Sequence, residues 1–443
     1  MMKKGLYLFL LLLSVGLISC KDDDAGEPLL PEEDFEVLEG NITQNLSLDA
    51  NKQYLLRGKV YVQAPNTLTI PAGTVIFGEK ATDGTLIINR GAKIMAEGTA
   101  TNPIVFTSQA APGFRNRGDW GGVVVLGNAQ TNNPANSPIE GISATGSENG
   151  IYGPGDGAAQ NEQNSGVMKF VRIEYAGIDL SQDNELNSLT MGALGSGTTI
   201  EHIMVSYAND DAYEWFGGTV NHKYLIAYNT LDDDFDSDRG YTGRVQYGLV
   251  VRFPGIADVS TSRAFEASSN NDASLPLQSA PSFANITVLG PRMFSSSVSG
   301  SYGAAVEINS NSSMKLHNSI ISGFPIGIRY NGSGAEAMVM NNVFVENTTL
   351  SSTSGGSSVP ATFESSNQVA SKEAVFGEGA VFNSATPSPL LLPAGSTYAA
   401  GAPELPAGFE QKGFWGAFGS SETDTDWNLT SGWIEWNPGD AQY

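Results

Sequence analysis

The chain has a single cysteine among its 443 residues, so no disulfide can form within it, and its stability has to come from a packed core and backbone pairing. Basic residues are also scarce: 23 Lys and Arg stand against 47 Asp and Glu, and the net charge is −24. This balance argues against nucleic acid as a partner and against adhesion to anionic lipid head groups, because both demand basic surface. Convincing amphipathic helices are missing as well, whereas 51 glycines and many Asn, Ser and Thr favour an all-β fold rich in turns.

The N-terminal segment carries a short apolar run. Lys3 and Lys4 precede this run, residues 6–18, which is too short for a membrane-spanning helix of about 20 residues. A basic start, an apolar centre and small residues at its end are typical of a secretory signal peptide, which we place at residues 1–19. The ending Leu17-Ile18-Ser19-Cys20 resembles the lipobox of bacterial lipoproteins. That resemblance implies cleavage before Cys20 and a lipid anchor on its sulfur; the alternative is an ordinary secreted protein.

An acidic segment follows the cysteine. Its start, Lys21-Asp22-Asp23-Asp24, resembles the export signal of surface lipoproteins in Bacteroidota, which implies an outer-membrane protein that faces the outside of the cell. The alternative is an acidic tether on a lipoprotein that faces the periplasm. Residues 20–39 contain too little apolar surface to fold, so we expect a lipidated cysteine followed by a flexible stalk.

Internal repeats indicate the fold of residues 40–443. The segments 68–76 and 86–94 are similar, and Gly73 holds the same place in the first as Gly91 in the second. A period near 18 to 24 residues suits one turn of a right-handed parallel β-helix, a solenoid whose strands pair with the equivalent strands of the next turn. A pair of β-sandwiches and a β-propeller are the structural alternatives.

Two further sets of residues fit the same coil. An apolar-x-Tyr pattern ends at Tyr175, Tyr207 and Tyr228, and a stacked ladder is expected of the asparagines that begin three later strands, Asn285, Asn318 and Asn342. The sequence resembles extracellular β-helix lipoproteins of Bacteroidota, most clearly at residues 68–107, 119–127, 170–252 and 413–438. We expect the aromatic tail, about residues 405–443, to cap the open end of the coil.

A cluster of acidic residues is the sharpest chemical feature. Asp179, Asp211 and Asp232 each lie four residues after one of the three tyrosines, so equivalent tyrosines would stack these aspartates on one face. Carboxylate oxygens without sulfur or histidine suit a hard cation, and Ca²⁺ fits best. We therefore predict a Ca²⁺ site; its candidate ligands are Asp211, Asp232, Asp234, Asp236 and Asp238. The alternative is a solvated acidic face or a set of turn-capping aspartates.

Two functional classes remain open. The first is a non-catalytic surface lipoprotein that binds a glycan, a cation or an outer-membrane partner such as a TonB-dependent transporter. The second is a Ca²⁺-dependent polysaccharide lyase or a glycoside hydrolase, with Arg239 or Arg244 as the base of a lyase and Asp210 or Glu214 among the acids of a hydrolase. The low basic content favours the first class, because the polyuronate substrates of lyases are themselves anionic.

Overall fold

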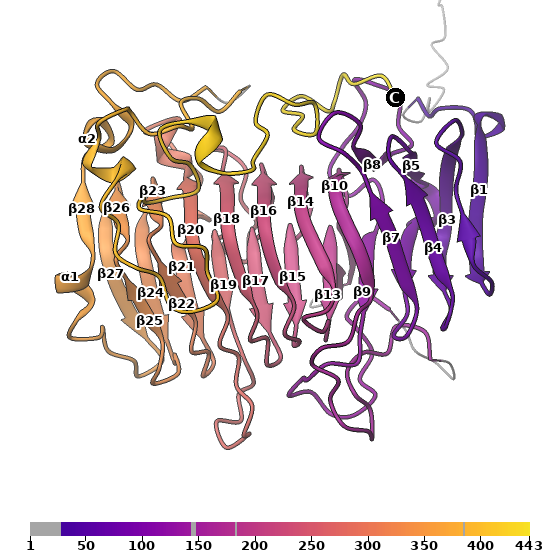
Figure 1. Cartoon of the computed structure of the whole chain (residues 1–443), viewed down its shortest axis with the longest axis horizontal. Helices are drawn as coiled ribbons and strands as arrows, with labels where there is room; N and C mark the ends of the chain where they lie inside the picture. Colours follow the sequence, from indigo (N-terminus) through magenta and orange to yellow (C-terminus); the bar gives the residue numbers. More distant parts are fainter. Residues whose placement is uncertain (1–27, 143–147, 182–183, 384–385) are drawn as a thin grey trace, which may run out of the picture.

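The computed structural model describes residues 28–142, 148–181, 184–383 and 386–443. Cys20 and the acidic segment Asp22–Asp24 lie outside the described residues, and so does the predicted signal peptide. Within the described chain, 26 strands form one continuous parallel sheet that winds into a right-handed solenoid, as predicted (Figure 1). None of the described helices is long and apolar enough to cross a membrane.

The solenoid has three faces, here called A, B and C. Face A is built from β1 (Phe35–Ile42), β3 (Gln53–Val62), β5 (Val75–Gly78), β8 (Ile104–Ser108), β10 (Gly166–Glu174), β14 (Thr199–Ser206), β16 (Asn221–Tyr228), β18 (Arg244–Val251), β20 (Ser282–Leu289), β23 (Ile320–Ser322), β26 (Val343–Val345) and β28 (Gln368–Ala370). Face B continues from the ends of β1 and β3 through β6 (Thr85–Ile88), β9 (Gly122–Leu126), β13 (Leu189–Gly192), β15 (Tyr213–Phe216), β17 (Phe235–Asp238), β19 (Phe265–Ala267), β21 (Ala304–Asn309), β24 (Ile326–Asn331) and β27 (Thr349–Ser354).

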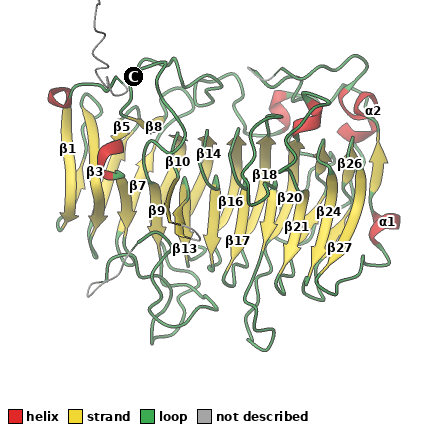
Figure 2. Cartoon of the chain, turned by 180° about the vertical axis from the view of Figure 1, so that it is seen from behind, coloured by secondary structure: helices red, strands yellow, loops and turns green. Residues whose placement is uncertain are grey.

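Face C consists of short strands and of the first halves of the long strands β10, β14, β16, β18 and β20, which bend from face C into face A. Its short strands are β2 (Leu46–Ser47), β4 (Thr67–Pro71), β7 (Lys93–Glu97), β22 (Lys315–His317) and β25 (Met338–Met340). Outside the faces lies the antiparallel hairpin of β11 (Ile178–Ser181) and β12 (Asn184–Leu186). The helices α1 (Phe363–Ser366) and α2 (Lys372–Phe376) also lie outside the faces (Figure 2). Five 3-10 turns complete the elements: Glu32–Asp34, Lys80–Thr82, Pro291–Met293, Thr397–Ala399 and Glu422–Asp424.

The strand pairings give the true repeat of the solenoid. Ile203 pairs with Leu225, and Leu225 pairs with Gly248, so an uninterrupted turn takes roughly 22 residues. The predicted equivalence of residues 68–76 and 86–94 is wrong, because Leu68 pairs with Ile94. The shorter spacing between those two segments matches two strand–glycine–strand corners at different positions of the coil rather than one position in successive turns.

Each long strand bends at a residue with a left-handed backbone. Phe170, His202, Tyr224 and Tyr247 occupy this position in successive turns, with φ between 50° and 64°. Their rings stack with centroids 4.3, 4.3 and 5.1 Å apart, which offsets part of the backbone strain. The row continues with asparagines, which tolerate this conformation well: Asn285, Asn318 and Asn341. Asn285 and Asn318 are therefore equivalent as expected, whereas Asn342 is out of register by one residue. The amides of Asn285 and Asn318 donate to the tail carbonyls of Phe414 and Pro403 rather than forming the expected ladder.

The C-terminal tail packs along the side of the solenoid rather than over its end, so the predicted position of the cap is wrong. Face A has an outward apolar surface that needs cover, and Trp427 and Trp433 are buried against it. The tail then runs back toward the N-terminal turns, where the Tyr443 hydroxyl donates to Glu174, 2.8 Å away (Figure 1). The C-terminal end of the bore is filled instead by Phe363 of α1.

Replacement of a tail tryptophan should destabilise the whole coil. Trp427 is 1% exposed, and its indole donates to the Ala417 carbonyl at 2.8 Å. We expect Trp427→Ala to cost about 3–5 kcal/mol of unfolding free energy, since it removes a large buried side chain. Urea denaturation followed by tryptophan fluorescence and circular dichroism measures the change. Val381→Ala is the control, because Val381 is 78% exposed; equal midpoints for the two variants would contradict the proposed packing role of the tail.

Candidate metal centre

The acidic cluster lies on face B and on the corner that leads into it. Tyr213 pairs with Phe235, and Glu214 pairs with Asp236 in the next turn. The rings of Tyr213, Trp215 and Phe235 fill the bore. Because side chains alternate along a strand, Glu214 and Asp236 point outward, one above the other.

The register at the corner differs from the prediction by one residue. Tyr175 and Tyr207 are equivalent and their rings stack at 5.1 Å, but the next equivalent residue is Asn229, since Tyr228 pairs with Ser206. The predicted stack of Asp179, Asp211 and Asp232 is therefore wrong.

Asp210 and Asp232, rather than Asp211 and Asp232, occupy equivalent positions in neighbouring turns, because Tyr213 and Phe235 are paired three residues later. Asp179 belongs to the hairpin outside the coil and accepts a hydrogen bond from Asn209 at 3.2 Å.

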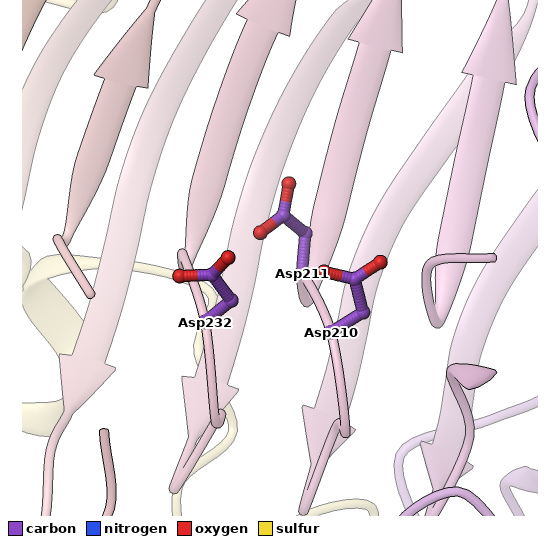
Figure 3. A group of neighbouring side chains, drawn as sticks. All are labelled: Asp210, Asp211 and Asp232. Carbon is purple, nitrogen blue, oxygen red and sulfur yellow. The ribbon is translucent and has the colours of Figure 1, made fainter. Parts of the chain in front are cut away.

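Two groups of carboxylates nevertheless come together. Asp210, Asp211 and Asp232 each offer an oxygen within 4.8 Å of the others (Figure 3). Asp211 also belongs to a second group with Glu214 and Asp236, in which the same limit holds. We call these the corner cluster and the face cluster; both can hold a metal ion, and they share Asp211.

Two of the predicted metal ligands belong to neither group. Asp234 is completely buried and forms an ion pair with Arg252 at 3.3 Å, so its charge is already balanced. Asp238 lies at the end of β17, where it pairs with Arg239 at 3.2 Å and accepts a hydrogen bond from the Arg239 backbone. The structure thus brings Asp211 together with Asp232 and with Asp236, whereas Asp234 and Asp238 have other partners.

The candidate bases do not face the corner cluster. Arg244 begins β18 on face C, beside Lys223 and Phe409, and so lies around the coil from the acidic residues. Arg239 is close to the cluster but its guanidinium is held by Asp238. Both arginines follow the acidic residues in the sequence, but in the folded chain neither of them faces the corner cluster.

Asp210 and Glu214 were expected only as catalytic acids, and the structure adds them to the carboxylate groups. Glu214 could have been found from the sequence by aligning residues 213–216 with residues 235–238. In both segments an aromatic residue that points into the bore precedes an acidic residue that points outward. Asp211 has a second task, because its Oδ1 accepts the Asp233 backbone N–H at 2.8 Å and so fixes the corner between turns.

Burial and mutual repulsion raise the pKa values of these carboxyl groups. Loss of solvation, followed by the charges of neighbouring acids, raises the pKa of Asp232 to about 8. The same two causes, in the same order, raise the pKa values of Asp210, Asp211, Glu214 and Asp236 well above the ordinary range. Such groups are stable together only when they are protonated or when a cation bridges them.

A surface hollow of about 500 Å³ opens over the corner cluster. The described residues that line it are Asp179, Glu185, Asn209, Asp210, Asp232, Asp258, Val259 and Ser260. Five of these eight residues are acidic, and none of the eight is basic or aromatic. The described lining therefore offers carboxylate oxygens that could hold a cation, and it contains no arginine or lysine.

A family model described as a pectate-lyase-like β-helix domain matches residues 40–389. No curated protein and no solved structure matches the chain. The match covers the solenoid from the end of β1 onward, including both carboxylate clusters, and ends before the tail.

The raised pKa values predict how the stability of the metal-free protein depends on pH. A folded-state pKa of about 8 against an ordinary Asp value of 3.8 means that the folded protein holds more protons than the unfolded chain. Stability should therefore fall as pH rises toward 8, and Asp232→Asn should reduce the slope. Burial lowers the pKa values of the three histidines, which act in the opposite sense below 6.5, so thermal denaturation of metal-stripped protein should be compared from pH 6.5 to 8.5. A melting temperature that stays constant or rises over this range would contradict the assignment.

Proposed function

This chain belongs to the pectate-lyase-like β-helix domain family, and we propose that it is a non-catalytic surface lipoprotein that binds acidic polysaccharide through Ca²⁺. Asp210, Asp211 and Asp232 would hold the cation at the bottom of the hollow. Carboxylate oxygens are the donors that Ca²⁺ prefers, and its six to eight coordination positions leave room for ligand oxygens. The observation that carries the proposal is the hollow itself, whose described lining is mostly acidic and contains no basic residue.

A bridging cation also resolves a problem of charge. At a net charge of −24 the protein repels an anionic glycan over most of its surface. A divalent ion in the hollow reverses the sign of the local field at the point where the glycan carboxylate would bind. Binding would then depend strictly on the metal.

The neighbouring arginines support a binding role rather than catalysis. A lyase base has to lose its proton, which burial promotes and nearby carboxylates oppose. For Arg263 burial lowers the pKa, but the surrounding carboxylates, led by Asp233, outweigh it and raise the pKa overall. Arg239 is paired with Asp238. Neither arginine lines the hollow.

The location belongs to the same proposal. Lipid on Cys20 would anchor the protein to the outer membrane. The predicted end of the stalk at residue 39 is wrong, because Phe35–Ile42 form β1 of the solenoid and Leu29 bridges to Ala110, so a stalk would be confined to residues before Leu29. A TonB-dependent transporter is the partner we propose for uptake of the bound glycan. The acidic surface supports the exclusion of nucleic acid.

Glycoside hydrolysis is the second candidate function. Its specific support is the pKa of about 8 for Asp232, because a carboxyl group that keeps its proton at neutral pH can serve as a general acid. Polysaccharide cleavage in the absence of metal would favour this alternative.

Calorimetric titration with Ca²⁺ tests the corner cluster. We expect the wild-type protein to bind Ca²⁺ and to gain about 2.7 kcal/mol of stability at a free concentration one hundred times the dissociation constant. Asp232→Asn should lose the part of this gain that comes from the corner cluster, because it removes one ligand and one charge. Asp272→Asn is the matched control, since Asp272 is an exposed aspartate outside both clusters. If wild type and Asp232→Asn show the same heat and the same melting temperature with Ca²⁺ and with chelator, the site does not exist.

Incubation with acidic polysaccharides tests the function itself. We expect retention of polygalacturonate or alginate in Ca²⁺, release by chelator, and no new ends on the polymer. The measurement combines affinity electrophoresis with assays for unsaturated and reducing ends. New ends that disappear in Asp210→Asn would replace the binding role with an enzymatic one, and absence of retention with Ca²⁺ bound would reject the glycan as ligand.

A further inference from the structure

Beyond the corner cluster, face B carries a longer row of outward residues. One position of the strand repeats in five successive turns, and the residues at this position are Thr190, Glu214, Asp236, Glu266 and Glu307. Four carboxylates thus stand above one another at the spacing of neighbouring strands, about 4.8 Å. Such a row is unfavourable unless its charge is balanced.

Arginines balance the C-terminal half of this row. Arg263 forms ion pairs with Glu266 at 2.8 Å and with Glu307 at 2.8 Å, and it reaches Asp233 at 3.3 Å. Arg329 adds a further pair to Glu307 at 3.3 Å. These carboxylates therefore need no additional cation.

The N-terminal half of the row has no such partner. Among the described residues, no ion pair reaches Glu214, Asp236 or Asp211, although Asp211 and Glu214 are each only 7% exposed. The Asn187 amide donates to Glu214, but this neutral contact leaves the charge in place. The Asp236 Oδ1 is buried and has no hydrogen-bond partner. The face cluster thus combines closely spaced oxygens with an unbalanced charge.

Thr190 supplies an independent observation at the same place. Leu189 and Met191 point into the bore, so Thr190 points outward and lies one turn below Glu214. Thr190 is 1% exposed, and its hydroxyl oxygen has no hydrogen-bond partner. A buried hydroxyl without a partner is costly, and a bound cation would give it one.

We propose that the face cluster binds a second divalent cation, held by Glu214 and Asp236 with the Thr190 hydroxyl as a neutral ligand, and joined to the first by Asp211 as a bridging carboxylate. Glu214 and Asp236 come from neighbouring turns, so the cation links β15 to β17. In later turns of the same row, Arg263 links Glu266 of β19 to Glu307 of β21 in the same way. The bridging role of Asp211 rests on the proposed function, because it requires a cation in the corner cluster. Binding of the second cation by Glu214, Asp236 and Thr190 does not require the corner site.

The two ions differ in their access to solvent. The corner site opens into the hollow, whereas Asp211 and Glu214 of the face cluster are themselves buried. The second ion is therefore structural and exchanges slowly, while the first exchanges with solvent and meets the glycan.

The number of Ca²⁺ ions bound by the full protein and by single-site variants tests this arrangement. Elemental analysis and calorimetry should give two ions for wild type, one for Asp210→Asn, one for Glu214→Gln and none that binds tightly for Asp211→Asn. Thr190→Val keeps the shape of the side chain and should weaken only the slowly exchanging ion, by about tenfold. Glu266→Gln is the matched control on the same face, and it should retain both ions because Arg263 already balances that position.

Each outcome separates the two proposals. One ion in wild type that Asp210→Asn removes and Glu214→Gln leaves in place would overturn the second site and preserve the first. One ion that only Glu214→Gln and Thr190→Val weaken would preserve the face site and reject the corner site. No ion at all, with circular dichroism unchanged by chelator, would mean that protons neutralise the carboxylates and would overturn both. If Glu214→Gln does not fold, the Thr190→Val result decides.

Discussion

The parallel register is the constraint on which this molecule depends. Each paired strand residue lies about 4.8 Å from its counterpart in the next turn, so residues at equivalent positions form rows along the solenoid. For aromatic side chains the repetition is favourable, and the bend from face C to face A stacks Phe170, His202, Tyr224 and Tyr247. For carboxylates the repetition is unfavourable, because like charges repel one another. The row that contains Glu214 and Asp236 therefore needs protons, arginines or a cation to neutralise its charge.

The same geometry decides which face is open for function. Face A is apolar on both sides, inward toward the bore and outward toward the tail, so its outer surface has to be covered. The tail therefore lies along the solenoid, and the rings of Trp427 and Trp433 pack against the aromatic row. The corner between faces A and B presents Asp210 and Asp232 to a hollow.

Much of this could be predicted from the sequence, and the limit is physical. Composition and short alternating segments predict a β-solenoid, and the density of aspartates predicts a cation site near Asp211 and Asp232. Register could not be predicted, because insertions of unequal length interrupt the turns: Leu225 pairs with Gly248 after a turn without insertion, whereas Gly248 pairs with Ile286 only after a long loop. A slip of one residue exchanges the two sides of a strand, and this is the error that made Tyr228 equivalent to Tyr207.

Arginine and a divalent cation are two solutions to one electrostatic problem, and in the row on face B the proposed cation would stand beside the arginine pairs. An arginine such as Arg263 is covalently fixed and fills the space beside its carboxylates, so it stabilises the turn and leaves nothing to bind. A cation satisfies the same carboxylates but keeps coordination positions for oxygens from outside. An arginine is sufficient where the row is purely structural, whereas the proposed cations lie where the row meets the hollow. On this view the site is able to accept a ligand because none of the described residues that line the hollow is basic.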